Sequence, residues 1–522
     1  MLRVLSVWHV CREYTGIAEA GGVKDVASGL ARALVRAGIP TTAVVPLYGL
    51  LPRDYQVPDP IASFTMPIPD HDETWTIREE PVQLRPLFLD GVRILLVDSP
   101  RFAEKRGVYT YTPEDEKLNQ HKRRGTGHWD FLQMNAILAR SALEGSLVLN
   151  EAPSLFHCHD GHAALLPAMM REDPRLAAGF ARTAAVLTIH NAGAGYHQEI
   201  WDKRFARLLT GLSMPILEQA LLDGMVDPFL LAAPYALLNT VSEQYARELL
   251  EENDKERGAG LGRALRERGI PLAGITNGVD PSPYDPRCPE KTGLPFRFDP
   301  STGDVGGRQR CRQVLAERLA PLGQLPGPGV PLYAFIGRLT SQKGVDVLVA
   351  AIRLWLRQKK QAAFVVLGEG EKWAEDSMRS LASDAGSRGS VFFLPTYDPA
   401  LAKLIDASSD FLLIPSIYEP CGLTDFHAQL LGCIPVVHRV GGLVKVEDGV
   451  TGFSYEEHST AGLSGAIDRT SALFARDPEL LARIRRQGFE RVLSRYTWER
   501  VLESGYMPLY ESALTGDEWT RG

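Results

Sequence analysis

Short apolar runs separated by stretches with helical spacing recur along the chain. In the first half the predicted strands cover residues 2–8, 41–46, 93–98, 155–159, 184–191 and 235–242. Between the first two runs, residues 24–37 carry apolar side chains at helical spacing. Uninterrupted apolar runs are typical of strands buried on both faces of a parallel sheet. Residues 48–89 are rich in Pro and Asp, and we expect antiparallel strands there.

The same alternation begins again in the second half. Its predicted strands cover residues 332–339, 362–371, 391–395, 410–414, 434–438 and 452–457. The stretch from 281 to 331 is dense in Pro and Gly and holds one candidate helix, which predicts an inter-domain region. The fold class is therefore α/β, with two doubly wound, Rossmann-like domains facing each other across a cleft.

Composition agrees with this organisation. A chain of 522 residues exceeds what one hydrophobic core usually holds, and 44% hydrophobic with 23% charged residues is ordinary for a soluble globular protein. A net charge of −7 argues against a protein built to bind nucleic acid. No apolar run reaches membrane-spanning length, so we expect no membrane association. Six scattered cysteines without a CxxC pair predict reduced thiols and a cytoplasmic location.

The stretch from 410 to 442 holds the most informative polar residues. After the strand at 410–414, Glu419 stands at the mouth of a helix predicted to begin near Cys421–Gly422, and Gly441–Gly442 follow the next strand. Ligands bind at such strand ends, and glycine amides with helix N-termini favour polyanions. A carboxylate would repel phosphate, so we expect Glu419 to face a neutral, hydroxyl-rich group, as in a sugar diphosphate. The alternative is an acidic helix cap beside an ordinary turn.

Two further segments have the chemistry of a phosphate site. Arg338 and Lys343 bracket a loop that opens into a helix, so two cations and a helix terminus converge. A solvated cationic pair is the alternative. Near the N-terminus, Gly21–Gly22 precede a helix and place backbone donors where an anionic group could bind.

Histidines are dense around residue 160, which raises the question of a metal. The run His157-Cys-His159-Asp-Gly-His162 resembles the HxHxDH pattern of binuclear zinc hydrolases, but Gly161 occupies the place of the required Asp. Because no further ligand set is evident, we do not expect a metal site. We expect His162 to donate a hydrogen bond to a sugar hydroxyl or a phosphate.

Eight motifs in order and spacing resemble the bacterial glycogen and starch synthase family. They are AGGVKDV, HCHDGHAAL, TIHN, TVSEQYARE, ITNGVD, GRLTSQKG, PSIYEPCGLT and GGL, and they span nearly the whole chain. The resemblance implies the GT-B fold and transfer of glucose, with retention, from ADP-glucose in preference to UDP-glucose onto an α-1,4-glucan. It implies no metal and no cofactor beyond the nucleotide sugar.

The resemblance also assigns domains and residues. It implies an acceptor-side domain at 1–270, a nucleotide-sugar domain at 271–497, and a last helix at 498–522 packed back on the first domain. Arg338 and Lys343 would neutralise the diphosphate. Glu419 would hold the glucose, and His162 would lie beneath it. Further substrate contacts are expected from Gly21, Gly22, Asp160, His190, Asn191, Asn277, Cys421, Gly422, Leu423, Thr424, Gly441 and Gly442.

Three positions depart from the family pattern. Glu19 stands two residues before the first glycine pair, where the family usually has Lys, and Lys24 is a candidate replacement cation. His427 stands where the wider GT-B group often has a second Glu, and Val440 replaces a Thr. Two rival hypotheses stay open: another retaining GT-B transferase that makes a di- or oligosaccharide, and a glucan-binding regulatory relative whose donor site has decayed.

Overall fold

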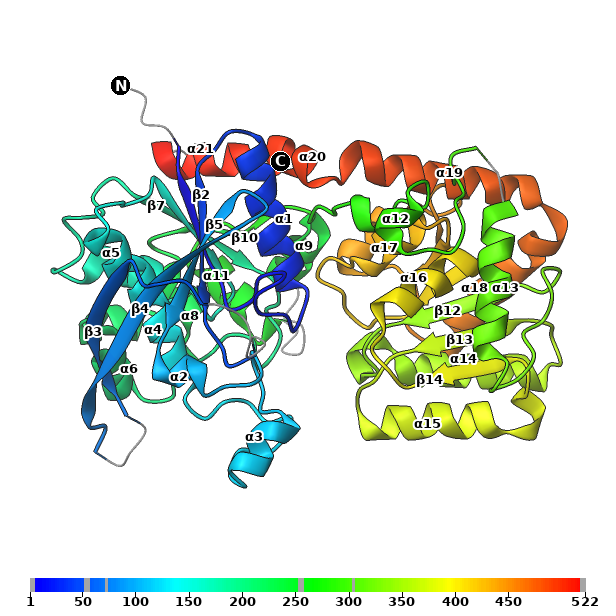
Figure 1. Cartoon of the computed structure of the whole chain (residues 1–522), viewed down its shortest axis with the longest axis horizontal. Helices are drawn as coiled ribbons and strands as arrows, with labels where there is room; N and C mark the ends of the chain where they lie inside the picture. Colours follow the sequence, from blue (N-terminus) through cyan, green and yellow to red (C-terminus); the bar gives the residue numbers. More distant parts are fainter. Residues whose placement is uncertain (1–4, 51–56, 71–73, 252–257, 303–305, 517–522) are drawn as a thin grey trace. The chain divides into compact units, whose positions relative to one another are not determined.

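A computed structural model describes residues 5–50, 57–70, 74–251, 258–302 and 306–516 (Figure 1). The chain forms two compact units. The second unit runs from Val279 to Arg500, and the first contains the residues before and after it. The observed division therefore follows Gly278, within the Asn-Gly turn of ITNGVD.

The first unit is built on a sheet with the order β11-β10-β7-β6-β1-β2-β5-β4-β3. Its strands are β1 (Val7–Val10), β2 (Thr41–Pro46), β3 (Ala62–Pro69), β4 (Ile77–Leu89), β5 (Val92–Asp98), β6 (Leu155–His159), β7 (Ala184–Ile189), β10 (Leu237–Thr240) and β11 (Ala273–Gly274). The strands are parallel except β3 and β4, the expected antiparallel excursion. The first strand begins at Val7, later than the predicted residue 2, and residues 2–4 lie outside the described residues.

The helices of this unit lie between the parallel strands along the chain. They are α1 (Val23–Arg36), α2 (Pro100–Ala103), α3 (Pro113–Leu118), α4 (Phe131–Val148), α5 (Leu166–Glu172), α6 (Lys203–Thr210), α7 (Met214–Gln219), α8 (Pro228–Ala232), α9 (Glu243–Glu251) and α11 (Leu261–Glu267). A small hairpin joins β8 (Leu221–Leu222) and β9 (Met225–Val226). The helix predicted from Gly161 begins only at Leu166, because residues 161–165 form turns. A Cβ on Gly161 would lie 2.4 Å from the His197 carbonyl oxygen, so only glycine fits this turn.

The last helix, α21 (Met507–Thr515), follows a π-helical turn at Leu502–Tyr506 and packs on the first unit. The Tyr510 hydroxyl hydrogen-bonds Nδ1 of His157 at 2.7 Å, and a Cβ on Gly505 would meet Ile275 at 2.7 Å. The end of the predicted helix, from 517 to 522, lies outside the described residues.

The second unit contains a wholly parallel sheet with the order β14-β13-β12-β15-β16-β17. Its strands are β12 (Leu332–Ile336), β13 (Ala363–Leu367), β14 (Val391–Leu394), β15 (Phe411–Ile414), β16 (Ile434–His438) and β17 (Phe453–Tyr455). Side chains alternate between the two faces, as strand geometry requires. Tyr333 and Phe335 pack in one core, and Leu332 and Ala334 pack in another.

Helices cover both faces of this sheet (Figure 1). The helices from residue 279 onward are α12 (Pro289–Thr292), α13 (Gly306–Leu319), α14 (Val345–Arg357), α15 (Lys372–Ser383), α16 (Pro399–Ser408), α17 (Thr424–Leu430), α18 (Thr460–Arg476), α19 (Pro478–Arg495) and α20 (Trp498–Val501), the last of which crosses the boundary after Arg500. The Pro- and Gly-rich stretch from 281 to 331 is part of this unit, since α13 buries Cys311 and Leu315 against the sheet. None of the helices described is long and apolar enough to cross a membrane.

Candidate functional site

The second unit pairs Glu419 directly with Lys343. The Lys343 ammonium donates to Oε2 of Glu419 at 2.5 Å, and the Ser416 hydroxyl donates to the same oxygen at 3.0 Å. Glu419 is only 8% exposed. Burial alone would raise the pKa of Glu419, but Lys343 and Ser416 outweigh it and lower that pKa. Glu419 is therefore a carboxylate at neutral pH.

The loops that bring the pair together need special backbone geometry. Lys343 ends a 3-10 turn after β12, and Gly344 follows it with φ +68. A Cβ on Gly344 would lie 1.9 Å from the carbonyl oxygen of Pro415, at the end of β15. The glycine thus lets the Lys343 loop press against the strand end that leads to Glu419. The helix predicted to begin near Cys421–Gly422 begins at Thr424.

Arg338 differs from Lys343 in its surroundings. It follows β12 and is exposed, and its guanidinium has no hydrogen bond or ion pair to any residue that the structure describes. One predicted cation is therefore engaged with a carboxylate, and the other is open to an anionic ligand.

The glycine pair after β16 serves close packing between two loops. Gly441 has φ +49, and a Cβ there would lie 2.1 Å from the Glu419 carbonyl oxygen. A Cβ on Gly442 would lie 2.1 Å from the carbonyl oxygen of Cys421. The Gly442 amide donates to the Glu419 carbonyl at 2.9 Å. This amide, expected to face a ligand, is thus occupied within the protein.

Sequence reasoning missed Lys445, which lies three residues after this pair. Its ammonium contacts the carbonyl oxygens of Cys421, Gly422 and Gly442 and the carboxylate of Asp425. Burial would lower the pKa of Lys445, but Asp425 outweighs it and raises that pKa. The positive charge is therefore retained inside the protein. The signal available in the sequence was a lone lysine in an otherwise apolar turn.

In the first unit the loop between β1 and α1 contains Gly21–Gly22, and we call it the glycine loop. Its backbone amides bind a carboxylate. Glu13 accepts hydrogen bonds from the Gly21 amide at 2.5 Å, the Ala20 amide at 3.1 Å and the Tyr109 hydroxyl at 2.5 Å. Burial raises the pKa of Glu13. The Gly21 donor is thus already used, whereas the Gly22 amide has no partner among the residues described. Sequence reasoning missed Glu13 and Tyr109.

Glu19 turns back onto its own loop. It accepts the Gly16 amide at 2.7 Å and lies 3.6 Å from the Lys24 ammonium. Lys24 also contacts Asp25 at 3.0 Å. The candidate replacement cation is therefore matched by carboxylates, and the glycine loop is acidic overall.

Asp160 and His162 lie in the turn after β6. Asp160 has the left-handed φ of +60 and accepts the His190 amide at 2.6 Å. Burial raises the pKa of Asp160 to about 7. The His162 ring packs on Tyr109 with ring centroids 4.9 Å apart, and burial holds the His162 pKa well below its usual range. The turn at the carboxyl end of β6 thus presents a neutral imidazole.

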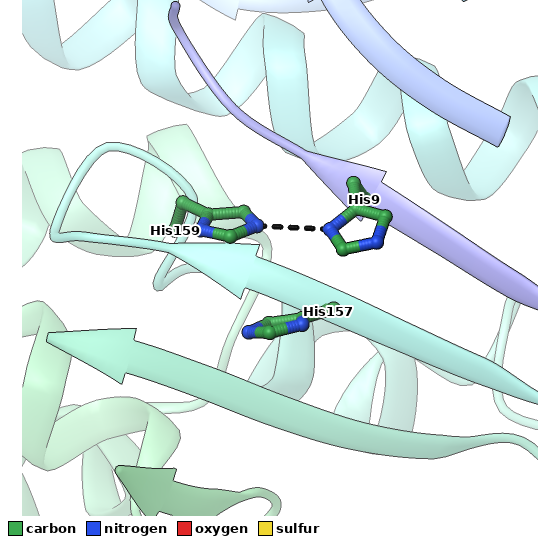
Figure 2. A group of neighbouring side chains, drawn as sticks. All are labelled: His9, His157 and His159. Carbon is green, nitrogen blue, oxygen red and sulfur yellow. Dashed lines mark hydrogen bonds between the residues drawn. The ribbon is translucent and has the colours of Figure 1, made fainter. Parts of the chain in front are cut away.

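Three buried histidines lie behind that turn, on β1 and β6 (Figure 2). Nε2 of His159 hydrogen-bonds Nδ1 of His9 at 3.0 Å, and Nδ1 of His159 hydrogen-bonds Nε2 of His190 at 3.0 Å. Burial lowers the pKa of His9 and of His190 to about 3. A chain of neutral rings thus runs from His190 into the core. Sequence reasoning missed His9.

His157 belongs to the same cluster but has other partners. The Thr188 hydroxyl donates its single proton to Asn239, so it accepts from Nε2 of His157 at 2.7 Å. Nδ1 of His157 therefore accepts from Tyr510. His9, His157 and His159 offer nitrogens within 4.8 Å of one another, the spacing that a metal would need. A metal would take one ring nitrogen from each histidine. His157 would then lose its hydrogen bond to Thr188 or to Tyr510, and His159 would lose its bond to His9 or to His190, so the arrangement favours hydrogen bonding.

The remaining predicted residues lie in varied surroundings. Asn191 accepts the Gly193 amide at 2.8 Å, and Asn277 is buried with Oδ1 lacking a partner among the described residues. His427, at the position of the second Glu, stacks on Tyr284 with centroids 3.8 Å apart. Val440 is buried in the core of the second unit.

Comparison with known proteins identifies both halves of the chain. A sequence profile described as the starch synthase catalytic domain matches residues 6–267, and one described as glycosyl transferases group 1 matches residues 325–491. The glycogen synthases of Thermodesulfovibrio yellowstonii and Koribacter versatilis are each 31% identical to this chain, over 97% and 96% of both partners. The glycogen synthase of Aeromonas hydrophila is 29% identical over 98% of both.

The fold is shared with a solved plant enzyme. The catalytic domain of starch synthase IV from Arabidopsis thaliana, bound to ADP and acarbose, has a TM-score of 0.79 and covers 98% of this chain and 100% of its own, at 24% identity. The expected fold class is thereby confirmed. The chain belongs to the glycogen and starch synthase family and is a hexosyltransferase with the GT-B fold.

Proposed function

We propose that this protein transfers glucose from ADP-glucose to the non-reducing end of an α-1,4-glucan, with retention at the anomeric carbon. The observation that carries the proposal is the Lys343–Glu419 pair at the carboxyl edge of the second sheet, within a chain of this family. Glycogen synthase relatives and a structural neighbour bound to ADP support the donor and the acceptor. We also propose a cytoplasmic location, from the scattered cysteines.

The strand order supports a direction for the donor. Along the carboxyl edge the loops follow one another as Tyr397 after β14, Arg338 after β12, Glu419 after β15 and Gly441 after β16. We place the diphosphate at Arg338 and Lys343, and the glucose at Glu419. The base then lies toward β14, where the Tyr397 side chain is 79% exposed and offers a face for stacking. We assign this second unit to the donor.

The chemistry divides among these residues. The bond between glucose C1 and the phosphate oxygen breaks, a bond from C1 to the acceptor hydroxyl oxygen forms, and the hydroxyl proton leaves with the diphosphate. Arg338 and Lys343 stabilise the negative charge that develops on the leaving group. Glu419, freed from Lys343 as that cation turns to phosphate, stabilises the positive charge on the sugar. We assign the glucan to the first unit, with His162 and His190 as neutral hydrogen-bonding groups.

The acidic glycine loop favours one alternative, a glucan-binding relative with a decayed donor site. The test is radiolabelled transfer to glycogen from ADP-glucose and from UDP-glucose in parallel, with maltose as a short acceptor. We expect incorporation into glycogen, faster from ADP-glucose. Glycogen binding without incorporation from either donor would favour the regulatory relative, and preference for maltose would favour an oligosaccharide-forming transferase.

A further inference from the structure

Lys445 is the most completely enclosed cation at the proposed donor site. Its ammonium lies 2.5 Å from the Cys421 carbonyl oxygen, 2.9 Å from that of Gly422 and 3.1 Å from that of Gly442. An ammonium has three donors, so these carbonyls use all of them. The carboxylate of Asp425 lies 3.1 Å away, and the Phe426 ring centroid lies 4.5 Å away.

These contacts join two loops that approach each other through glycines. Cys421 and Gly422 follow Glu419, whereas Gly442 follows β16. Gly422 has φ +74, and a Cβ there would lie 2.9 Å from Leu443 and 3.0 Å from Asp425. The backbone therefore closes tightly around the ammonium. Without that cation, three carbonyl oxygens would face one another and a carboxylate in a buried space.

The direction of the carbonyls fixes the direction of the amides. In a trans peptide the N–H of the next residue points opposite to the C=O. Because the carbonyls of Cys421 and Gly422 face Lys445, the amides of Gly422 and Leu423 face away from it. Neither amide has a hydrogen-bond partner among the residues that the structure describes.

We infer that Lys445 is a positioning residue that presents the amides of Gly422 and Leu423 to an oxygen of the donor substrate. The inference rests on the proposed function, because that function places the donor at this loop. The oxygen belongs to a glucose hydroxyl or to the diphosphate. Asp425 balances the buried charge and makes no contact with substrate in this scheme.

The main test is Lys445→Met, which keeps the length of the side chain and removes the charge. We expect kcat with ADP-glucose to fall about 30- to 100-fold, the size of effect expected from loss of positioning. The KM for glycogen should change less than about twofold. Affinity for ADP alone distinguishes the two oxygens: unchanged binding points to a glucose hydroxyl, and weaker binding points to phosphate. The control is Lys360→Met, which removes the surface ion pair with Asp468 in the same unit.

Two further measurements keep the inference falsifiable. Lys445→Met leaves the Asp425 carboxylate buried without its cation, which destabilises the fold. The double variant Lys445→Met/Asp425→Asn removes the unpaired carboxylate, so it should recover part of the lost melting temperature but not kcat. Recovery of kcat along with stability would overturn the positioning role.

The contacts of the Lys445 ammonium with the carbonyls of Cys421, Gly422 and Gly442 form what we call the clamp. Hydrogen exchange tests this clamp without reference to activity. The Gly442 amide, bonded to the Glu419 carbonyl, should exchange at least tenfold faster in Lys445→Met than in wild type. Unchanged exchange in this loop would overturn the inference. If wild-type protein transferred no glucose while the exchange result appeared, the proposed function would fail and the clamp would stand.

Discussion

Apart from the acidic loop after β1, the two sheets differ in the electrostatics of their carboxyl ends. We call the turns after β6 and β7 in the first unit the neutral edge, and the loops after β12 and β15 in the second unit the charged edge. In the first unit, His162 and His190 are held neutral by burial, and the pKa of Asp160 is raised to about 7. In the second unit, Lys343 and Glu419 are both charged and in contact. A neutral edge suits a hydroxyl-rich glucan, because it costs no desolvation of fixed charge. A charged edge suits a substrate whose charge changes during the reaction.

The two edges differ in how they avoid an unpaired charge among buried side chains. The first unit meets burial with uncharged rings that hydrogen-bond one another, as His9, His159 and His190 do. The second unit meets it with matched ions, Lys343 with Glu419 and Lys445 with Asp425. Matched ions can exchange partners when a charged ligand arrives, whereas neutral rings stay neutral. We therefore expect substitutions to affect chemistry mainly in the second unit and protonation mainly in the first.

The largest expected effect tests the charged edge. Glu419→Gln keeps the shape of the side chain and removes the charge, so kcat should fall by about 10²- to 10³-fold or more. Lys343→Met should weaken ADP-glucose binding and slow transfer together, while the KM for glycogen stays near wild type. The measurement is steady-state transfer to glycogen with each substrate varied.

The double variant Glu419→Gln/Lys343→Met shows whether the two residues work as a unit. Its loss should be much smaller than the product of the single losses, because residues that act together are not additive. Folding of Glu419→Gln is checked by circular dichroism. Turnover near wild type in this variant would contradict the claim that the charge of Glu419 supports the reaction.

An intermediate effect tests the neutral edge through pH. In the folded state Asp160 holds a proton up to about pH 7, whereas in the unfolded chain it loses the proton near the usual pKa of 3.8 for an aspartate. Between these values the folded state binds more protons, so its stability falls as pH rises from about 4 to about 7. Asp160→Asn removes this contribution and should stabilise the first unit at pH 8 relative to wild type, with less gain at pH 5.

Hydrogen exchange of β6 and β7 measures this effect in the first unit alone, since a chain of two units need not unfold in one step. Asp173→Asn is the matched control. Burial would raise the pKa of Asp173, but Arg175 outweighs it and lowers that pKa. Its contribution is therefore constant from pH 5 to 8. Equal pH dependence in wild type and Asp160→Asn would show that Asp160 does not titrate in this range.

The sequence predicted regular elements well and long-range contacts poorly. The strand predicted at 434–438 is β16 with the same bounds, because its apolar run from 434 to 437 is continuous and lies between Gly432 and the Gly441–Gly442 pair. The helix after Glu419 began later than predicted because Gly422 takes a left-handed conformation that Lys445 and Asp425 surround. No local pattern announces that contact.

The first unit shows the same limit. Glu13 acts through Tyr109, which lies 96 residues later, and His9 acts through His159, which lies 150 residues later. A lone Glu or His beside an apolar strand carries no signal of such partners. Motif resemblance found the residues that could contact substrate, but the residues that hold them in place became visible only once the strands were assembled.

The smallest expected effect concerns Glu19, which stands in the acidic loop after β1 where the family usually has Lys. Glu19 is about half exposed, so solvent screens its charge and its influence on a diphosphate should be within about 1 kcal/mol, or about fivefold. Glu19→Lys should therefore lower the KM for ADP-glucose by no more than about fivefold and leave kcat unchanged. Glu19→Gln separates the charge from the hydrogen bond, because the amide oxygen can still accept the Gly16 N–H. If wild type were silent and Glu19→Lys active, the acidic loop would be what blocks the donor. The charge of the loop after β1 would then control donor binding. The hypothesis of a regulatory relative would replace that of a synthase.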